Sequence, residues 1–279
     1  MNASLLKTWL RDACPPAVWK LAKAWRSSPV SDLATTEIAR LSALPKYSRT
    51  TTRLLGPELT VTDAQSFVSI YWAYFRREEY RFRAASDAPL IIDGGANVGV
   101  GVRYWKHLYP RARVIAFECD PESFAALQHN TRDLTGVTLR PEALWVENGP
   151  VSFTAVGADG GHLAAVGTGE HAAKNLPVRA VRLRDQLEEP VDLLKLDIEG
   201  AEIDVLLDCR DRLSLVRNLF VEYHAFVGRP QRLKEFFGVL ESAGFRVHTH
   251  PDVPAPQPFL ERPVSNGKDF RMNVFCFRE

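Results

Sequence analysis

Two acids and a histidine follow apolar runs that have the length of buried strands. Asp197 and Glu199 come after one run, and His224 follows the next. Because the carboxyl ends of parallel strands meet at one edge of a sheet, we expect these side chains to share a cleft. A carboxylate or an imidazole can accept the proton of a hydroxyl group and so make its oxygen a better nucleophile. The sequence therefore predicts general-base chemistry by Asp197, Glu199 and His224.

The same region offers a second chemistry, in which a metal ion activates the hydroxyl group. Glu222 shares the strand face of His224, because side chains two residues apart point to the same side. A divalent ion held by Asp197, Glu199 and Glu222 would lower the pKa of a bound hydroxyl group, and oxygen ligands suit magnesium or calcium. We favour direct proton acceptance without a metal, since the ordinary pKa of His224 suits that task best.

A glycine-rich turn after an earlier predicted strand indicates a nucleoside ligand. The strand 90–93 leads into Asp93-Gly-Gly-Ala-Asn-Val-Gly99 and then into a predicted helix. This arrangement opens a nucleotide-binding βαβ unit. Gly95 can adopt a positive φ and let a ligand approach the backbone, and Asn97 tolerates the left-handed region. Gly99 is expected to let the helix pack against the strand.

Two further acids complete the predicted ligand site. Glu118 ends the next predicted strand, 19 residues after Gly99, where an acid can accept hydrogen bonds from ribose hydroxyl groups. Glu142 follows the third strand, near the expected place of an adenine ring. Asp93 precedes the turn, where it would repel a phosphate and suit a cationic ligand. This charge pattern favours S-adenosylmethionine over NAD.

Strands that alternate with helices must position these side chains. Strands are predicted at 90–93, 113–117, 137–140, 192–197, 217–223, 245–249 and 271–277, and helices at 98–108, 121–134, 201–208 and 230–243. The alternation predicts an α/β fold with a mostly parallel sheet and helices on both faces. The last strand follows its neighbour without a helix, so we expect it to be antiparallel. Residues 147–183 predict an inserted β-hairpin at the sheet edge, with a mobile loop around 157–174.

The 279 residues are predicted to form one large domain preceded by an arm. Residues 1–45 form the arm, whose first 26 residues predict two helices rich in tryptophan and basic side chains. Residues 46–279 form the ligand-binding domain. A basic amphipathic helix could lie at a membrane surface, but we favour packing of the arm on the core or on a partner subunit. The oligomeric state stays open.

Composition argues against several classes of protein. Hydrophobic residues make up 46% and charged residues 25% of the chain, as in ordinary globular proteins. The net charge of +1 provides no global field for nucleic acid. The four cysteines lack paired spacing, which favours a reducing compartment over a disulfide framework. With no apolar run of membrane-spanning length and no signal-peptide core, we predict a cytoplasmic protein.

Four motifs of the chain resemble those of the FkbM-type S-adenosylmethionine-dependent methyltransferases. They are Asp93-Gly-Gly-Ala-Asn-Val-Gly99, Phe117-Glu-Cys-Asp-Pro121, Lys195-Leu-Asp-Ile-Glu-Gly-Ala-Glu202 and Val221-Glu-Tyr-His224. The resemblance covers about residues 55–277. It implies the Rossmann-like class I methyltransferase fold with seven strands in the order 3-2-1-4-5-7-6, the seventh antiparallel. It also implies O-methylation of a hydroxyl group on a sugar, glycan or natural product by a methyltransferase domain spanning 46–279.

With this resemblance the candidate residues receive roles. Asp93, Gly95, Asn97 and Gly99 are assigned to the methionine part of S-adenosylmethionine, Glu118 to its ribose and Glu142 to its adenine side. Asp197, Glu199 and His224 are the candidates to take the proton of a small-molecule or glycan acceptor. Two alternatives stay open: an NAD-type dehydrogenase, and a non-enzymatic protein that binds a nucleoside or a partner. The acids around the turn argue against the first, and the intact cleft residues argue against the second.

Overall fold

The computed structural model describes residues 32–155, 162–163, 174–251, 257–261 and 264–278. The chain divides into two units, Met1–Ala43 and Leu44–Glu279. The described part of the first unit is the helix α3 (Asp32–Ser42), which was not predicted from the sequence. The two helices predicted in residues 1–26 lie outside the described residues, as does nearly all of the predicted loop at 157–174.

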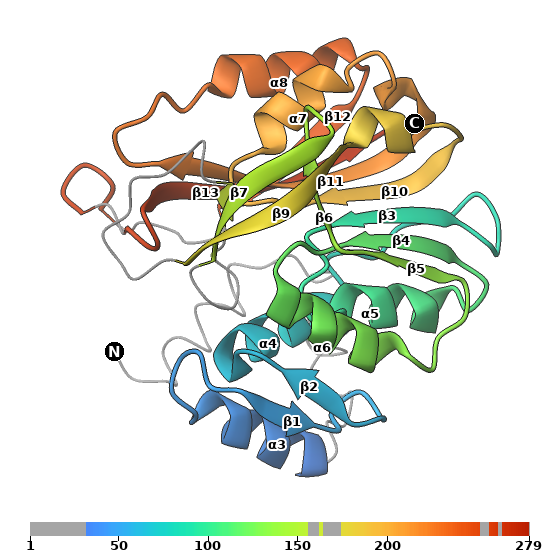
Figure 1. Cartoon of the computed structure of the whole chain (residues 1–279), viewed down its shortest axis with the longest axis vertical. Helices are drawn as coiled ribbons and strands as arrows, with labels where there is room; N and C mark the ends of the chain where they lie inside the picture. Colours follow the sequence, from blue (N-terminus) through green and yellow to red (C-terminus); the bar gives the residue numbers. More distant parts are fainter. Residues whose placement is uncertain (1–31, 156–161, 164–173, 252–256, 262–263, 279) are drawn as a thin grey trace, which may run out of the picture. The chain divides into compact units, whose positions relative to one another are not determined.

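The second unit is built on a seven-stranded sheet with the order β12-β13-β11-β10-β3-β4-β5 (Figure 1). In chain order its strands are β3 (Leu90–Gly94), β4 (Arg113–Phe117), β5 (Val137–Arg140), β10 (Val191–Leu196), β11 (Val216–Phe226), β12 (Arg246–Pro251) and β13 (Lys268–Phe277). Neighbours from β5 to β11 are parallel, and β13 is antiparallel to both β11 and β12. Numbered along the chain within this sheet, the order reads 3-2-1-4-5-7-6 from the β5 edge. The predicted mostly parallel sheet is confirmed.

Helices cover both faces of this sheet, as predicted (Figure 1). On one face lie α4 (Ala64–Tyr71), α5 (Val100–Leu108) and α6 (Pro121–Thr131), and on the other α7 (Glu202–Asp208) and α8 (Leu233–Ser242). Asp63 and Asp120 cap α4 and α6 by accepting backbone N–H groups of the first turn. On the α7 and α8 face, Leu194 of the sheet packs in one hydrophobic core with Leu206 and Leu240. Burial of these apolar side chains holds the layers together.

The segment after β5 forms a sheet of its own, which corrects the expected hairpin at the edge of the main sheet. Its order is β6-β9-β7-β8, with β6 (Glu142–Trp145), β7 (Gly149–Ala155), β8 (His162–Leu163) and β9 (Lys174–Arg182). Strands β7 and β9 form the predicted antiparallel pair, but β9 also pairs in parallel with β6. Leu144 of β6 and Val181 of β9 are buried in the same core as Leu194. Burial of Leu144 and Val181 in this core favours the pairing of β9 with β6, so the hairpin belongs to the second sheet and not to the edge of the main sheet.

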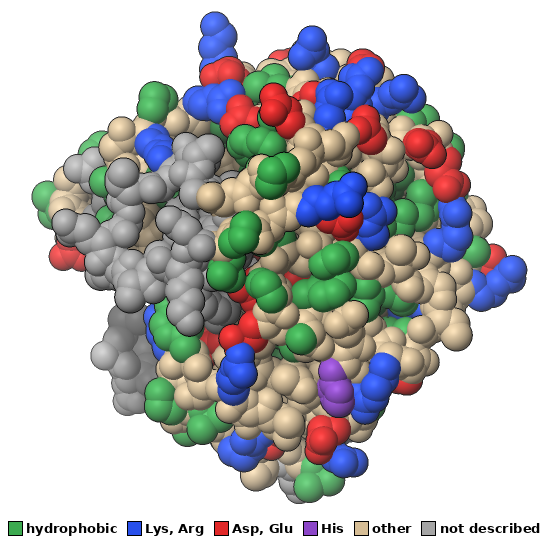
Figure 2. Space-filling model, in the orientation of Figure 1, with side chains coloured by type: hydrophobic (Ala, Val, Ile, Leu, Met, Phe, Trp, Pro, Cys, Tyr) green, Lys and Arg blue, Asp and Glu red, His purple; other side chains and the backbone are tan. Residues whose placement is uncertain are grey.

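Smaller elements complete the second unit. An antiparallel pair of strands, β1 (Thr50–Thr52) and β2 (Leu59–Val61), precedes α4, and α4 runs on into the π-helical turn η1 (Trp72–Arg76). Two 3₁₀ turns lie at η3 (Leu183–Gln186) and η4 (Leu213–Leu215). In the part of the chain that the structure describes, every helix is too short or too polar to cross a membrane. Acidic and basic side chains are interspersed on the face shown in Figure 2.

Candidate active site

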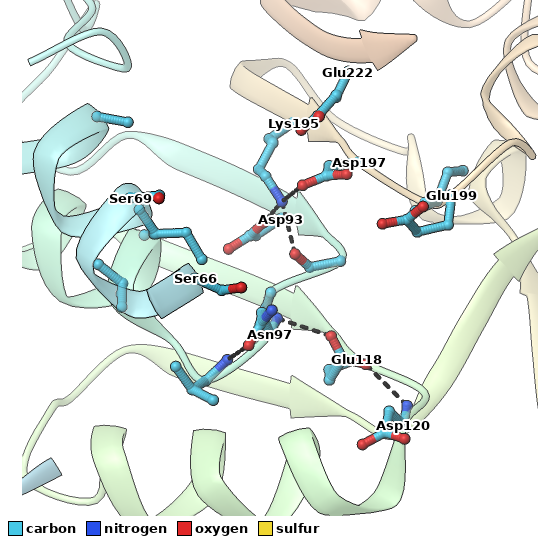
Figure 3. A pocket seen from close by; sticks show the side chains of 18 of the residues that line it. Ser66, Ser69, Asp93, Asn97, Glu118, Asp120, Lys195, Asp197, Glu199 and Glu222 are labelled. Atoms are coloured by element: carbon cyan, nitrogen blue, oxygen red, sulfur yellow. Dashed lines mark hydrogen bonds and ion pairs between the residues drawn. The ribbon is translucent and has the colours of Figure 1, made fainter. Parts of the chain in front are cut away.

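A cavity of about 550 Å³ opens at the carboxyl ends of β3, β4, β10 and β11. Acids from all four strand ends converge on it, and α4 adds Ser66 and Ser69 (Figure 3). The cavity lining contains every site residue predicted from the sequence except Gly99 and His224. The strand-end argument therefore located the cavity, although it did not identify all of its lining.

The turn after β3 has the predicted backbone conformation. Gly95, Asn97 and Gly99 have φ angles of 81°, 49° and 87°. The reasons for the glycines differ from those expected. A Cβ on Gly95 would lie 2.0 Å from the backbone oxygen of Asp197, and a Cβ on Gly99 would lie 2.7 Å from Leu127 Cδ1 of α6. Gly95 thus lets the turn pack on the end of β10, and Gly99 lets it pack on α6.

Lys195 is a buried cation of the site that the sequence argument left without a role. Its Nζ lies 3.2 Å from Asp93 Oδ1 and 3.6 Å from Asp197 Oδ2, and it donates a 2.7 Å hydrogen bond to the Gly95 carbonyl oxygen (Figure 3). Burial lowers the pKa of Lys195, but the carboxylates of Asp93 and Asp197 overcome this and raise it to about 12. Lys195 is therefore charged at neutral pH.

This ion pair corrects the expected role of the Asp93 charge. The Asp93 side chain is only 1% exposed, and Lys195 balances its charge before any ligand binds. The preference for a cationic ligand must come from the other acids of the cavity. Lys195 precedes Asp197 by two residues and so points to the same face of the strand, a spacing that could have revealed the pair from the sequence.

Glu118 and Glu142 border one end of the cavity. The Glu118 carboxylate accepts hydrogen bonds from the backbone N–H groups of Asn97 and Asp120, at 2.8 and 2.9 Å. Burial raises the pKa of Glu118 to about 7, although these two donors lower it. Glu142, at the start of β6, forms a bidentate pair with Arg140 at 3.0 and 3.2 Å. The two acids predicted for ribose and adenine thus line one cavity, from different sheets.

Three carboxylates, two from the turn after β10 and one from within β11, line the cavity, and we call Asp197, Glu199 and Glu222 the carboxylate cluster (Figure 3). The Asp197 side chain is 28% exposed. Glu199 forms an ion pair with Lys268 of β13, and Glu222 Oε1 lies 3.8 Å from a guanidinium nitrogen of Arg271. Burial raises the pKa of Glu199, although His224 and Lys268 lower it. Each of the three carboxylates therefore has a protein cation within ion-pair distance.

His224 lies beneath the cavity and not at its mouth. Strand β11 runs to Phe226, three residues beyond its predicted end, because β13 continues to pair with it there. His224 is opposite Arg271 in this pairing, and its side chain is 1% exposed. Burial lowers the pKa of His224, but the carboxylates of Glu199 and Glu202 raise it to about 9. A histidine that retains its proton at neutral pH is a poor proton acceptor.

Glu202 holds His224 in place. Its Oε1 lies 2.9 Å from His224 Nδ1, and its carboxylate also accepts the backbone N–H of Gly200 at 3.0 Å and that of Ile198 at 3.2 Å. Through these backbone contacts the Glu202 side chain holds the turn that leads into its own helix, α7. The contact with His224 is an addition that the sequence did not indicate, since the two residues come from different strand ends.

Two tyrosines that were not predicted as site residues form an aromatic wall of the cavity. Tyr74 of η1 stacks on Tyr80 with ring centroids 3.9 Å apart and planes inclined by 5°. Burial raises the pKa of both hydroxyl groups well above the ordinary value. Both side chains are therefore neutral at any physiological pH and can donate hydrogen bonds. The charge-rich stretch 76–83, which contains Tyr80, is of a kind that often lines a ligand cleft, but the sequence singled out neither tyrosine.

Comparison with known proteins gives a consistent result. The model of the methyltransferase FkbM domain family matches residues 93–247. Methyltransferase sdnD of Sordaria araneosa is 29% identical over 73% of this chain and 94% of its own length. The 2-O-methyltransferase NoeI of Sinorhizobium fredii is 29% identical (48% of this chain, 63% of its own), and the hexuronic acid methyltransferase AglP of Haloferax volcanii is 27% identical (51% and 59%). The family match includes every candidate site residue predicted above.

Proposed function

The chain belongs to the FkbM methyltransferase family, and from this premise we propose that it transfers a methyl group from S-adenosylmethionine to a hydroxyl oxygen of a sugar, glycan or natural product. The main observation that supports S-adenosylmethionine as the donor is the acidic cavity at the strand ends, which the glycine turn borders. The acceptor class is supported by the relatives, of which one is named for 2-O-methylation and one for a hexuronic acid. Family membership favours a methyltransferase over both alternatives considered from the sequence.

The lining of the cavity fits this donor by charge. S-adenosylmethionine supplies an electrophilic methyl group on a sulfonium, and it carries an ammonium group as well. The lining contains more acidic than basic side chains, and this excess of negative charge would attract both cations. We assign Glu118 to the ribose hydroxyl groups, Glu142 to the adenine side, and the turn residues to the methionine part: Asp93, Gly95, Asn97 and Gly99. Asp93 would act there through Lys195, and Gly99 through the backbone of the turn.

On the acceptor side, the carboxylate cluster supplies the candidate bases. Asp197 and Glu199 line the cavity, where a carboxylate could take the proton as the acceptor oxygen attacks. In-line transfer also needs the two reactants held in alignment. His224 does not line the cavity, and we therefore give it a positioning role through Glu199 and Glu222. This shifts the preferred base from the histidine, which the sequence favoured, to the carboxylates.

Titration calorimetry with S-adenosylhomocysteine tests the donor assignment. We expect micromolar binding with one ligand per chain, because the cavity recognises the nucleoside and amino-acid parts that this product shares with the donor. NADH is the control ligand and is expected not to bind, since its phosphates would meet the carboxylate cluster. Binding of NADH alone would support the alternative of an NAD-type dehydrogenase. A folded sample that binds neither ligand would contradict the proposed donor.

The affinity for S-adenosylhomocysteine should fall as the pH drops below about 7. Ribose hydroxyl groups donate to a carboxylate, so binding favours charged Glu118, whose pKa in the free protein is raised to about 7. Below this pH the ligand must displace a proton, and affinity should fall by up to about tenfold per pH unit. Calorimetry from pH 5 to pH 8 measures this slope. Glu118→Gln should bind more weakly with a flat pH profile, whereas Glu122→Gln, an acid of α6, should keep the slope. An unchanged slope in Glu118→Gln would remove Glu118 from ligand binding.

A further inference from the structure

His224 has a ring nitrogen that is sealed from solvent and lacks a hydrogen-bond partner. Its Nε2 is buried and makes no hydrogen bond. The nearest carboxylate oxygens, Glu199 Oε2 and Glu222 Oε1, both lie 3.7 Å away, beyond hydrogen-bond distance. Leaving a buried polar nitrogen without a hydrogen-bond partner is unfavourable. His224 Nε2 therefore faces two carboxylates that are too distant to form a hydrogen bond with it.

The other ring nitrogen decides which tautomer His224 adopts. Nδ1 lies 2.9 Å from Glu202 Oε1. Both oxygens of the Glu202 side chain already accept backbone N–H groups of Ile198 and Gly200, so Glu202 acts as the acceptor and His224 Nδ1 as the donor. Metal-binding histidines commonly donate one ring N–H to a carboxylate in this manner, which leaves the second nitrogen to bind the ion.

The donor atoms around Nε2 have the spacing of a coordination shell. Single ligand atoms of Asp197, Glu199 and His224 lie within 4.8 Å of one another. Ligands bound at about 2.0–2.2 Å from one ion are separated by roughly 3 to 4.4 Å. The 3.7 Å separation between Nε2 and Glu199 Oε2 is inside this range. Lys268 pairs with the same oxygen and would have to move aside as the ion binds. Asp197, whose side chain is 28% exposed, is the most solvent-accessible of the three groups and would complete the shell from the cavity side.

Charge around His224 points to the same conclusion. Among the residues that the structure describes, the ion pairs given above link five carboxylates with three cations around His224: Asp93, Asp197, Glu199, Glu202 and Glu222, with Lys195, Lys268 and Arg271. These side chains carry an excess of two negative charges when His224 is neutral. A proton on Nε2 balances one of them, and a divalent ion balances both.

We propose that Asp197, Glu199 and His224 form a binding site for a divalent transition-metal ion, with Glu222 close enough to join it. The ion takes the place of the Nε2 proton. An imidazole together with carboxylates suits ions such as Mn²⁺ or Zn²⁺, whereas the oxygen-only set considered from the sequence suits magnesium or calcium. Three protein ligands leave open positions, and Asp197 and Glu199 line the cavity on that side.

The location gives the ion a role in the reaction. An ion with open positions at the cavity would bind an acceptor hydroxyl group and lower its pKa. With Asp197 and Glu199 engaged as ligands of the ion, Glu222 is the neighbouring carboxylate in the lining that would take this proton at neutral pH. This role rests on the proposed function, whereas ion binding itself does not.

Manganese titration of the metal-stripped full-length protein tests the site. Electron spin resonance of free Mn²⁺ is expected to show one tight site per chain, and spin-echo spectra of the bound ion should show coupling to one imidazole nitrogen. In His224→Asn the amide can keep the contact with Glu202 but lacks the equivalent of Nε2. We expect at least about tenfold weaker Mn²⁺ binding, the loss seen even for partners outside the first coordination shell. His129→Asn, an exposed histidine on α6, should bind Mn²⁺ like the parent protein.

Several outcomes would overturn the metal site. They are equal Mn²⁺ affinity in His224→Asn and the parent protein, several weak sites per chain, or no imidazole coupling in the parent protein. The last measurement needs no variant, so misfolding of His224→Asn cannot obscure the answer. S-adenosylhomocysteine binding is measured in the same samples. Donor binding without Mn²⁺ binding defeats the metal site alone, and Mn²⁺ binding without donor binding defeats the proposed donor alone.

Discussion

Gly95→Ala is expected to destabilise the protein by about 2–5 kcal/mol and to abolish binding of S-adenosylhomocysteine. The φ of 81° places any L side chain in the left-handed region, which costs about 1–2 kcal/mol. The added Cβ would also lie 2.0 Å from the Asp197 carbonyl oxygen, a backbone atom that cannot turn away. Relief requires the turn to separate from the end of β10, where Asp197 N–H donates to the Gly94 carbonyl oxygen at 3.1 Å. Overpacking of this kind typically costs a further 1–3 kcal/mol.

Gly228→Ala is the matched control for this substitution. Gly228 has a nearly identical φ of 78°, but a Cβ there would meet no atom within 4 Å. We expect a loss of about 1–2 kcal/mol from the backbone alone, with ligand binding retained. Urea denaturation of the two variants measures the difference. Equal losses of stability in the two variants would show that an added Cβ at position 95 does not clash with the Asp197 carbonyl oxygen.

Lys195→Met is expected to destabilise the protein by about 3–5 kcal/mol, the usual cost of removing one partner of a buried ion pair. The methionine leaves the carboxylate of Asp93, which is 1% exposed, without its cation. It also removes the donor to the Gly95 carbonyl oxygen, so the turn should loosen. Chemical denaturation gives the loss of stability, and calorimetry with S-adenosylhomocysteine should show weaker binding in the folded fraction.

A second substitution separates the charge from the loss of packing. Asp93→Asn in the Lys195→Met background removes the unpaired charge, so part of the lost stability should return. Lys106 provides the control, since it is also buried but donates to the backbone carbonyls of Pro110 and Ala112. Asp93→Asn should restore nothing in a Lys106→Met protein. If the two double variants behave alike, the pairing of Lys195 with Asp93 is not what stabilises this site.

Local chemistry in the sequence determined the elements of the fold and the location of the cavity. Apolar runs predicted all seven strands of the main sheet, because the hydrophobic periodicity that distinguishes strands from helices is visible within short stretches of chain. The residue types at Gly95 and Asn97 predicted that this turn could adopt left-handed backbone, as it does. The carboxyl ends of parallel strands share one edge, so Glu118 and Asp197 could be placed at one cavity before any contact was known.

Pairings between distant segments decided the rest, since register and burial depend on neighbours that a local pattern does not contain. His224 reads as a strand-end residue, but antiparallel β13 continues past that point and buries it. Asp93 reads as a free acid, but Lys195, about a hundred residues later, neutralises it. The strand β6 that joins β9 likewise had no local signature. The sequence therefore determined where the site lies and which acids reach it. The tertiary structure added Lys195, Tyr74 and Tyr80 to the site, buried His224, and decided the charge and exposure of each group.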